Sequence, residues 1–118
     1  MAFHSSSVDG GIEKSAHVWV NGELLPWDDC HVHVLTHALH YGSAVFEGIR
    51  CYDTVKGPAV FRLPEHVRRL RESAHAYRME LAFTDEQLIA ATCETIRANK
   101  LRACYIRPIV FRGYRALE

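Results

Sequence analysis

An Asn-Gly pair between two apolar runs is the strongest constraint on how this chain begins to fold. Asn21-Gly22 separates residues 17–20 from residues 23–27. A two-residue type I′ turn needs positive φ at both central positions, and Asn followed by Gly adopts it readily. The pair therefore predicts a β-hairpin, with Pro26 at a strand end or edge because proline has no N–H to donate.

A second hairpin is expected in the middle of the chain. Residues 45–52 and 59–62 have strand-like composition, and residues 56–58 (KGP) between them favour a turn. Gly48 interrupts the first strand, which indicates a bulge or the close approach of another group to the backbone.

Helical signals lie on both sides of this hairpin. Residues 36–41 resemble a short helical turn that Gly42 can end. A longer helix is predicted from Pro64, because proline suits the first turn and apolar residues then recur at spacings of three and four. These apolar residues are Val67, Leu70, Ala74 and Tyr77.

A further helix and a strand complete the pattern. Thr84 and Gln87 form a capping-box pattern, and Asn99 is a plausible end for the helix that follows. Residues 104–111 are rich in β-branched and aromatic side chains, which favours a strand. The order predicts an α+β domain, in which an antiparallel sheet of hairpins has two helices packed on one side.

Length and composition are those of one ordinary soluble domain. The chain has 118 residues, with 14 Lys plus Arg against 14 Asp plus Glu. This balance gives no electrostatic reason to expect a nucleic acid partner, and no apolar run is long enough to span a membrane. We expect residues 1–15, rich in Ser and Gly, to be a mobile leader, and residues 16–118 to form the domain.

One face of the predicted strand over residues 45–52 has an unusual composition for a core. Phe46, Gly48 and Arg50 alternate to one side, whereas Glu47 and Ile49 face the other. An aromatic ring, a glycine and an arginine suit the wall of a ligand site, where the glycine makes room.

Two further arginines could bind anions. Tyr105 and Arg107 share one face of the last strand, which is either an exposed face or a polar wall that receives a carboxylate. Arg69 is next to Arg68 but points about 100° away around its helix. Either both are solvated surface residues, or Arg69 holds a phosphate.

Clustered histidines and cysteines raise the question of metals and disulfides. The histidines 31, 33, 37 and 40 match no familiar ligand spacing, so packing and turn hydrogen bonds are expected and no metal. The cysteines 30, 51, 93 and 104 form no CxxC pair, which favours free thiols in a reducing cytoplasm.

Several of these segments together resemble the branched-chain amino acid aminotransferases, which are fold-type IV pyridoxal-phosphate enzymes. Residues 40–50 (HYGSAVFEGIR) look like a characteristic segment of that family. The pattern His66-x-x-Arg69-Leu70, the strand 105–108 (YIRP) and the opening hairpin 18–23 (VWVNGE) resemble further segments in the same order. The resemblance runs from about residue 17 to residue 117.

This resemblance implies a transaminase that moves the amino group between leucine, isoleucine or valine and 2-oxoglutarate or glutamate. It implies pyridoxal 5′-phosphate held between two domains, with Arg69 on the cofactor phosphate. Tyr105 would receive the substrate carboxylate with support from Arg50, and Arg107 would accept the distal carboxylate of glutamate.

The resemblance implies roles for three further residues. Phe46 and Gly48 would line the apolar side-chain pocket, and Tyr41 would reach into the site of a neighbouring subunit in a dimer or larger homo-oligomer.

The sequence departs from the family pattern in two places. The Schiff-base lysine and the C-terminal domain of the family lie beyond residue 118, and Lys14, Lys56 and Lys100 match no catalytic position, so this chain alone is expected to be inactive. Residues 115–118 stand where the family has a glycine-rich turn, and the final Leu-Glu resembles a cloning remnant.

The alternatives to a branched-chain aminotransferase are a D-amino acid aminotransferase, an aminodeoxychorismate lyase, or a non-catalytic assembly module of the same fold.

Overall fold

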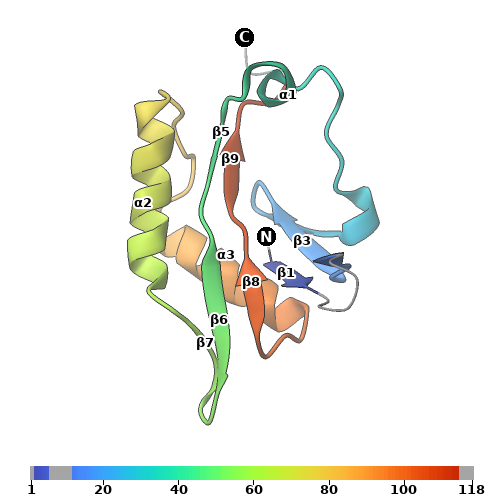
Figure 1. Cartoon of the computed structure of the whole chain (residues 1–118), viewed down its shortest axis with the longest axis vertical. Helices are drawn as coiled ribbons and strands as arrows, with labels where there is room; N and C mark the ends of the chain where they lie inside the picture. The colour runs from blue at the N-terminus through green and yellow to red at the C-terminus, as the bar shows by residue number, and fades with distance from the viewer. Residues whose placement is uncertain (1, 6–11, 115–118) are drawn as a thin grey trace.

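The protein is described here by a computed structural model that covers residues 2–5 and 12–114 (Figure 1). Its strands are β1 (Ala2–Ser5), β2 (Ile12–Glu13), β3 (His17–Val20), β4 (Glu23–Pro26), β5 (Ala44–Phe46), β6 (Ile49–Thr54), β7 (Gly57–Val60), β8 (Cys104–Ile106) and β9 (Ile109–Phe111). Its helices are a 3-10 turn (Trp27–Asp29), α1 (His37–Tyr41), α2 (Leu63–Ala76) and α3 (Asp85–Ala98). The segment 115–118, with its suspected cloning remnant, lies outside the described residues.

The strands form antiparallel sheets, and α2 and α3 lie on the same side of them (Figure 1). One sheet has the order β2-β1-β8-β6-β7, and two further strand pairs are β3-β4 and β5-β9. The predicted α+β architecture, with hairpins in an antiparallel sheet and two helices packed on one side, is therefore confirmed.

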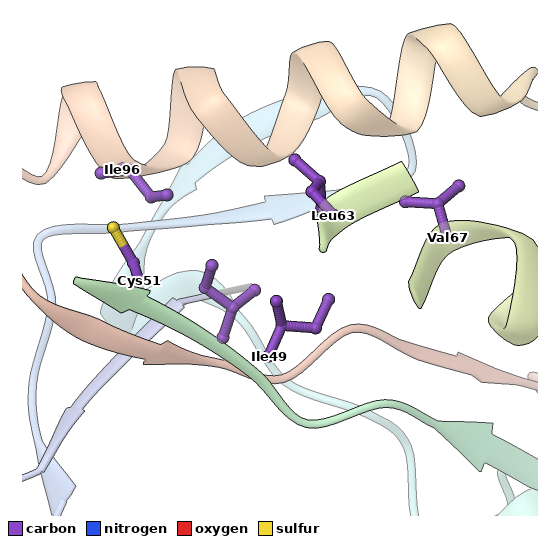
Figure 2. Packing of buried hydrophobic residues seen from close by; sticks show 6 residues of the cluster. Ile49, Cys51, Leu63, Val67 and Ile96 are labelled. Atoms are coloured by element: carbon purple, nitrogen blue, oxygen red, sulfur yellow. The ribbon is translucent and has the colours of Figure 1, made fainter. Parts of the chain in front are cut away.

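A small apolar core joins the five-stranded sheet to the two helices. Ile49 and Cys51 of β6 point toward Leu63 and Val67 of α2 and toward Ile96 of α3 (Figure 2). Each of these five side chains is buried. The alternation of β6 therefore sends one set of residues into the core and leaves Arg50 exposed on the opposite face.

Local sequence signals account for several element boundaries. Asn21 and Gly22 have φ values of 49° and 99°, as the type I′ turn requires. Gly42 ends α1 in the left-handed conformation. The capping box at α3 is present, with the Thr84 N–H donating to Gln87 Oε1 at 2.8 Å and the Gln87 N–H donating to Thr84 Oγ1 at 3.1 Å. Asn99 follows α3 as its C-terminal cap.

Two predictions about strands were wrong. The expected strand over 45–52 is split into β5 and β6, and the expected strand over 104–111 is split into β8 and β9. The two breaks face each other, because Phe46 pairs with Ile109 on one side of them and Ile49 pairs with Ile106 on the other. Pro108 contributes to the break since it cannot donate to a strand ladder.

The first residues differ from expectation in their secondary structure. Sequence reasoning assigned no strand before residue 17, but β1 pairs with β8 and β2 pairs with β1. The docking partner, β8, lies near the other end of the chain, so no local signal marks the pairing. The mobility of residues 1–15 and the domain boundary at residue 16 stay predictions.

Candidate functional site

Four of the predicted site residues, Phe46, Gly48, Tyr105 and Arg107, lie where the two long strand runs break. Glu47 and Gly48 lie between β5 and β6, opposite Arg107 and Pro108 between β8 and β9. The Glu47 N–H donates to the Pro108 carbonyl at 3.1 Å, which holds the two breaks together. The strands before and after each break are paired, so the backbone that carries the side chains at the breaks is held in place on both sides.

Tyr105, Gly48, Arg107 and Phe46 form one compact group on the face away from the helices. Arg107 Nη2 donates to the Tyr105 hydroxyl at 2.8 Å, and the Arg107 guanidinium carbon lies 4.1 Å from the centre of the Phe46 ring. A Cβ atom at Gly48 would lie 2.2 Å from the Tyr105 hydroxyl oxygen, so the hydroxyl occupies the space that any other residue would fill. The glycine is therefore required by a close approach, as the sequence pattern indicated.

This geometry leaves donors available for an acidic ligand. Because Arg107 donates to the Tyr105 oxygen, the tyrosine O–H is left to donate to another acceptor. Arg107 Nε is buried and has no hydrogen-bond partner among the described residues. A buried, unpaired guanidinium N–H is costly unless a ligand satisfies it. Carboxylates are strong acceptors for hydrogen bonds of this kind.

Arg50 lies beside Tyr105 in the sheet. The two residues are direct partners in the antiparallel β6–β8 ladder, and the Arg50 side chain is exposed on the same face. Directly opposite side chains in such a ladder lie about 5 Å apart at Cβ. The structure thus brings Arg50 within reach of a ligand held by Tyr105.

Arg69 takes part in an ion pair on α2. Its guanidinium binds the Glu47 carboxylate through Nε, at 2.9 and 3.1 Å from the two oxygens, and through Nη2 at 2.8 Å. The Arg69 side chain is 65% exposed, whereas that of Glu47 is 5% exposed. Burial alone would raise the pKa of the Glu47 carboxyl, but hydrogen bonds from Arg69 and His66 hold this pKa below its ordinary value.

Tyr41 is not brought into the group around Tyr105. It belongs to α1, which lies at the end of the β5–β9 pair farthest from β8 (Figure 1). Its side chain is 75% exposed, and its ring centre is 4.5 Å from that of His37.

Sequence reasoning missed Glu47 and His66. The pattern placed Glu47 on the face opposite Phe46 but gave it no role, and His66 was noted only as part of a motif. His66 Nδ1 lies 2.7 Å from Glu47 Oε1. The signal that could have found them is the spacing of His66 and Arg69, three apart on one helix face, together with a carboxylate on a strand that faces the helices.

The clustered histidines make local hydrogen bonds, as expected. His37 Nδ1 lies 2.6 Å from Ser43 Oγ, His40 Nε2 lies 2.8 Å from the Val34 carbonyl, and His33 Nδ1 accepts the Leu35 N–H at 3.0 Å. Within residues 2–5 and 12–114, no group of three His, Cys, Asp or Glu side chains could hold a metal ion. The four cysteines are free thiols.

The helical side contains a separate cavity of about 400 Å³. Its lining includes Trp19 of β3, Phe83, Leu88 of α3 and Val110 of β9, but none of the predicted site residues. The cavity is thus distinct from the polar group at the strand breaks.

In the part of the chain that is described, no helix is both long and apolar enough to cross a membrane.

Comparison with known proteins adds independent findings. The amino-transferase class IV family model matches residues 44–117. The branched-chain-amino-acid aminotransferase of Salmonella typhimurium is 52% identical over 101 residues, which cover 86% of this chain and 33% of that protein. The chain therefore spans about a third of the length of the curated relatives it matches.

Solved structures show the same similarity to branched-chain aminotransferases, again over about a third of their length. The Escherichia coli branched-chain amino acid aminotransferase has a TM-score of 0.83 and 51% identity, covering 85% of this chain and 34% of that one. The branched-chain aminotransferase from the archaeon Thermoproteus uzoniensis, solved with norvaline, has a TM-score of 0.82 and 38% identity, covering 88% and 35%. The branched-chain amino acid aminotransferase from Thermobaculum terrenum, solved in its PLP form, has a TM-score of 0.76 and 35% identity, covering 84% and 33%.

Proposed function

Because this chain belongs to the amino-transferase class IV family, we propose that it is the N-terminal small domain of a two-domain branched-chain amino acid aminotransferase. The whole protein transfers the amino group between leucine, isoleucine or valine and 2-oxoglutarate. The observation that carries this proposal is the group of Tyr105, Arg107, Phe46 and Gly48 at the strand breaks, which presents unsatisfied donors beside an apolar ring.

The residues at this site fit pyridoxal 5′-phosphate and an amino acid substrate. The Arg69 guanidinium has five N–H groups, and its contacts with Glu47 use only Nε and Nη2, so donors remain for a phosphate. When bound, the cofactor supplies the electron sink that transamination needs. The PLP form of the Thermobaculum terrenum enzyme supports this cofactor for the family.

The side chains of this domain bind and orient the substrate. Tyr105 donates its O–H to the substrate carboxylate, and Arg50 supports that carboxylate from the neighbouring strand. Arg107 donates to the second carboxylate of glutamate through the N–H groups of its guanidinium. The Phe46 ring contacts a branched aliphatic side chain when the substrate is leucine, so one wall serves both substrates.

The catalytic lysine comes from the C-terminal domain in this proposal. Lys14 is engaged with Asp28 at 2.9 Å, Lys56 lies in the turn between β6 and β7, and Lys100 follows α3. None of these positions is at the strand breaks. We further propose a cytoplasmic homo-oligomer, with Tyr41 reaching the site of the neighbouring subunit from its exposed position on α1.

Turnover by the full-length protein tests the proposal. We expect transamination between leucine and 2-oxoglutarate, and Arg107→Ala should raise the KM for glutamate more than the KM for leucine because only glutamate has a second carboxylate. Turnover of D-alanine or aminodeoxychorismate without turnover of leucine would favour the alternative enzymes. A full-length protein without any turnover would favour an assembly module.

A further inference from the structure

Glu47 is a buried carboxylate at the break between β5 and β6, and the proposed reaction gives it no role. Its neighbours Phe46 and Gly48 are exposed on the substrate face, while its own side chain, 5% exposed, points to α2. A charge that is removed from water is costly unless strong partners satisfy it. The partners of Glu47 therefore show what the buried charge does.

Both partners come from the same face of α2. His66 and Arg69 are three residues apart, a spacing that places side chains next to each other on a helix. His66 Nδ1 lies 2.7 Å from Oε1, and Arg69 contacts both carboxylate oxygens at 2.8 to 3.1 Å. On the other side of the residue, the Glu47 N–H donates to the Pro108 carbonyl at 3.1 Å. One residue thus connects α2 to the break that carries Arg107.

From this geometry we propose that Glu47 is a positioning residue that holds the Arg69 guanidinium in the orientation that receives the cofactor phosphate. The inference rests on the proposed function. Arg69 is 65% exposed, so without a fixed partner its long side chain would sample many rotamers. Contact with both carboxylate oxygens fixes the plane of the guanidinium and leaves N–H donors pointing away from Glu47.

A second effect of Glu47 opposes this one. The negative charge of Glu47 partly neutralises Arg69, which weakens the attraction for an anion. Orientation and neutralisation predict opposite results when the carboxylate is altered. Loss of orientation weakens phosphate binding, whereas loss of neutralisation strengthens it. The low pKa of the Glu47 carboxyl, caused by hydrogen bonds from Arg69 and His66 that outweigh burial, keeps the group ionised at neutral pH.

The test measures cofactor binding in the full-length protein, separately from turnover. Dissociation constants for pyridoxal 5′-phosphate and for pyridoxal, which lacks the phosphate, are obtained by absorbance titration. The ratio of the two constants isolates the phosphate contribution. Glu47→Asp keeps the charge but shortens the side chain, and Glu47→Gln keeps the length but loses one acceptor oxygen. Glu94→Gln, at an exposed position on α3, is the control.

We expect both Glu47 variants to weaken pyridoxal 5′-phosphate binding by about tenfold, while pyridoxal binding changes by less than about twofold. Glu94→Gln should leave both constants unchanged. Tighter phosphate binding in Glu47→Gln would overturn the inference in favour of neutralisation. Equal losses for the two ligands would overturn it in favour of a purely structural role. If Glu47→Asp does not fold by circular dichroism, Glu47→Gln decides between these outcomes.

Arg69→Ala and Arg68→Ala separate this inference from the proposed function. Arg69→Ala should remove the preference for the phosphorylated ligand, and Arg68→Ala should retain it. If Arg69→Ala retains the preference, the proposed phosphate site and the role of Glu47 both fail. If Arg69→Ala removes it and the Glu47 variants do not, only the role of Glu47 fails.

Discussion

The contact between Gly48 and Tyr105 makes the glycine the most sensitive position of the site. In Gly48→Ala the new Cβ would meet the Tyr105 hydroxyl oxygen at 2.2 Å and the ring carbon Cζ at 3.0 Å, so the tyrosine must move. Its hydrogen bond with Arg107 is lost with that movement. We expect the KM of the full-length enzyme for leucine to rise at least about tenfold, with a destabilisation of about 1–3 kcal/mol.

Gly113→Ala is the matched control for this prediction, because a Cβ at Gly113 has no heavy atom within 4 Å. Steady-state kinetics and thermal unfolding of both variants provide the measurement. An unchanged KM in Gly48→Ala would show that Tyr105 does not bind the substrate in this position.

Single residues were predicted well where strand alternation alone decides orientation. The assignment of Phe46, Gly48 and Arg50 to one face and of Glu47 and Ile49 to the other agrees with their exposure in the structure. The role of Glu47 could not be predicted in the same way. A buried carboxylate is acceptable only because His66 and Arg69 reach it from a helix, and that contact depends on packing between distant segments.

Glu47 should also make the stability of the fold sensitive to acid. Its folded pKa lies below the unfolded value of about 4.3, so its contribution is fully present above that pH and is lost as pH falls through the folded pKa. Urea unfolding measured from about pH 7 to about pH 3 should therefore show a smaller loss of stability in Glu47→Gln than in the unaltered protein. Asp53→Asn is the control, because its pair with Arg102 is exposed and contributes little.

At the scale of elements, turns and helix ends that depend on adjacent residues were predictable from the sequence. Features that depend on the pairing of distant segments were not. The Asn21-Gly22 turn, the Thr84 capping box and the end of α3 at Asn99 were each predicted and found, because the residues that cause them are adjacent in the chain. The breaks at residues 47–48 and 107–108 were not predicted as breaks, because Gly48 indicated only a bulge or a close approach within one strand. They occur together since each strand run pairs with the other, which a single segment cannot reveal.

Asn99 has a function beyond ending α3. Its Oδ1 accepts the His17 N–H at 2.8 Å, and its Nδ2 donates to the His17 carbonyl at 3.1 Å and to the Thr95 carbonyl at 2.8 Å. One side chain thus fastens the β3–β4 hairpin to α3. Asn99→Ala would leave both backbone groups of His17 without these partners.

We expect Asn99→Ala to lower the free energy of unfolding by roughly 2–3 kcal/mol, since part-buried backbone groups lose their hydrogen bonds. Thr84→Ala, which removes one hydrogen bond at the other end of the same helix, should cost about 1 kcal/mol. Chemical denaturation of the two variants compares these losses. A cost for Asn99→Ala no larger than that for Thr84→Ala would mean that the hairpin is held by packing rather than by Asn99.

For the whole molecule, the most unusual surface is the segment that leads into α1. Val34, Leu35, Leu39 and Tyr41 are between 61% and 75% exposed. They lie on the loop and helix at the end of the β5–β9 pair, away from the core between the sheet and α3 (Figure 1). Exposed apolar side chains that lie close together in one segment, unlike those scattered singly, favour association with another protein surface.

The 118-residue chain alone should therefore self-associate in solution. We expect Leu39→Glu to shift the protein toward monomer, because it places a charge within the apolar segment and makes its burial costly. Val55→Glu is the matched control: Val55 is 103% exposed but stands in the turn between β6 and β7, at the opposite end of the structure from α1 (Figure 1). Light scattering and sedimentation at high and low protein concentration measure the mass of each variant. A monomer at every concentration for the unaltered chain would contradict the prediction, and an equal effect of the two substitutions would locate the association elsewhere.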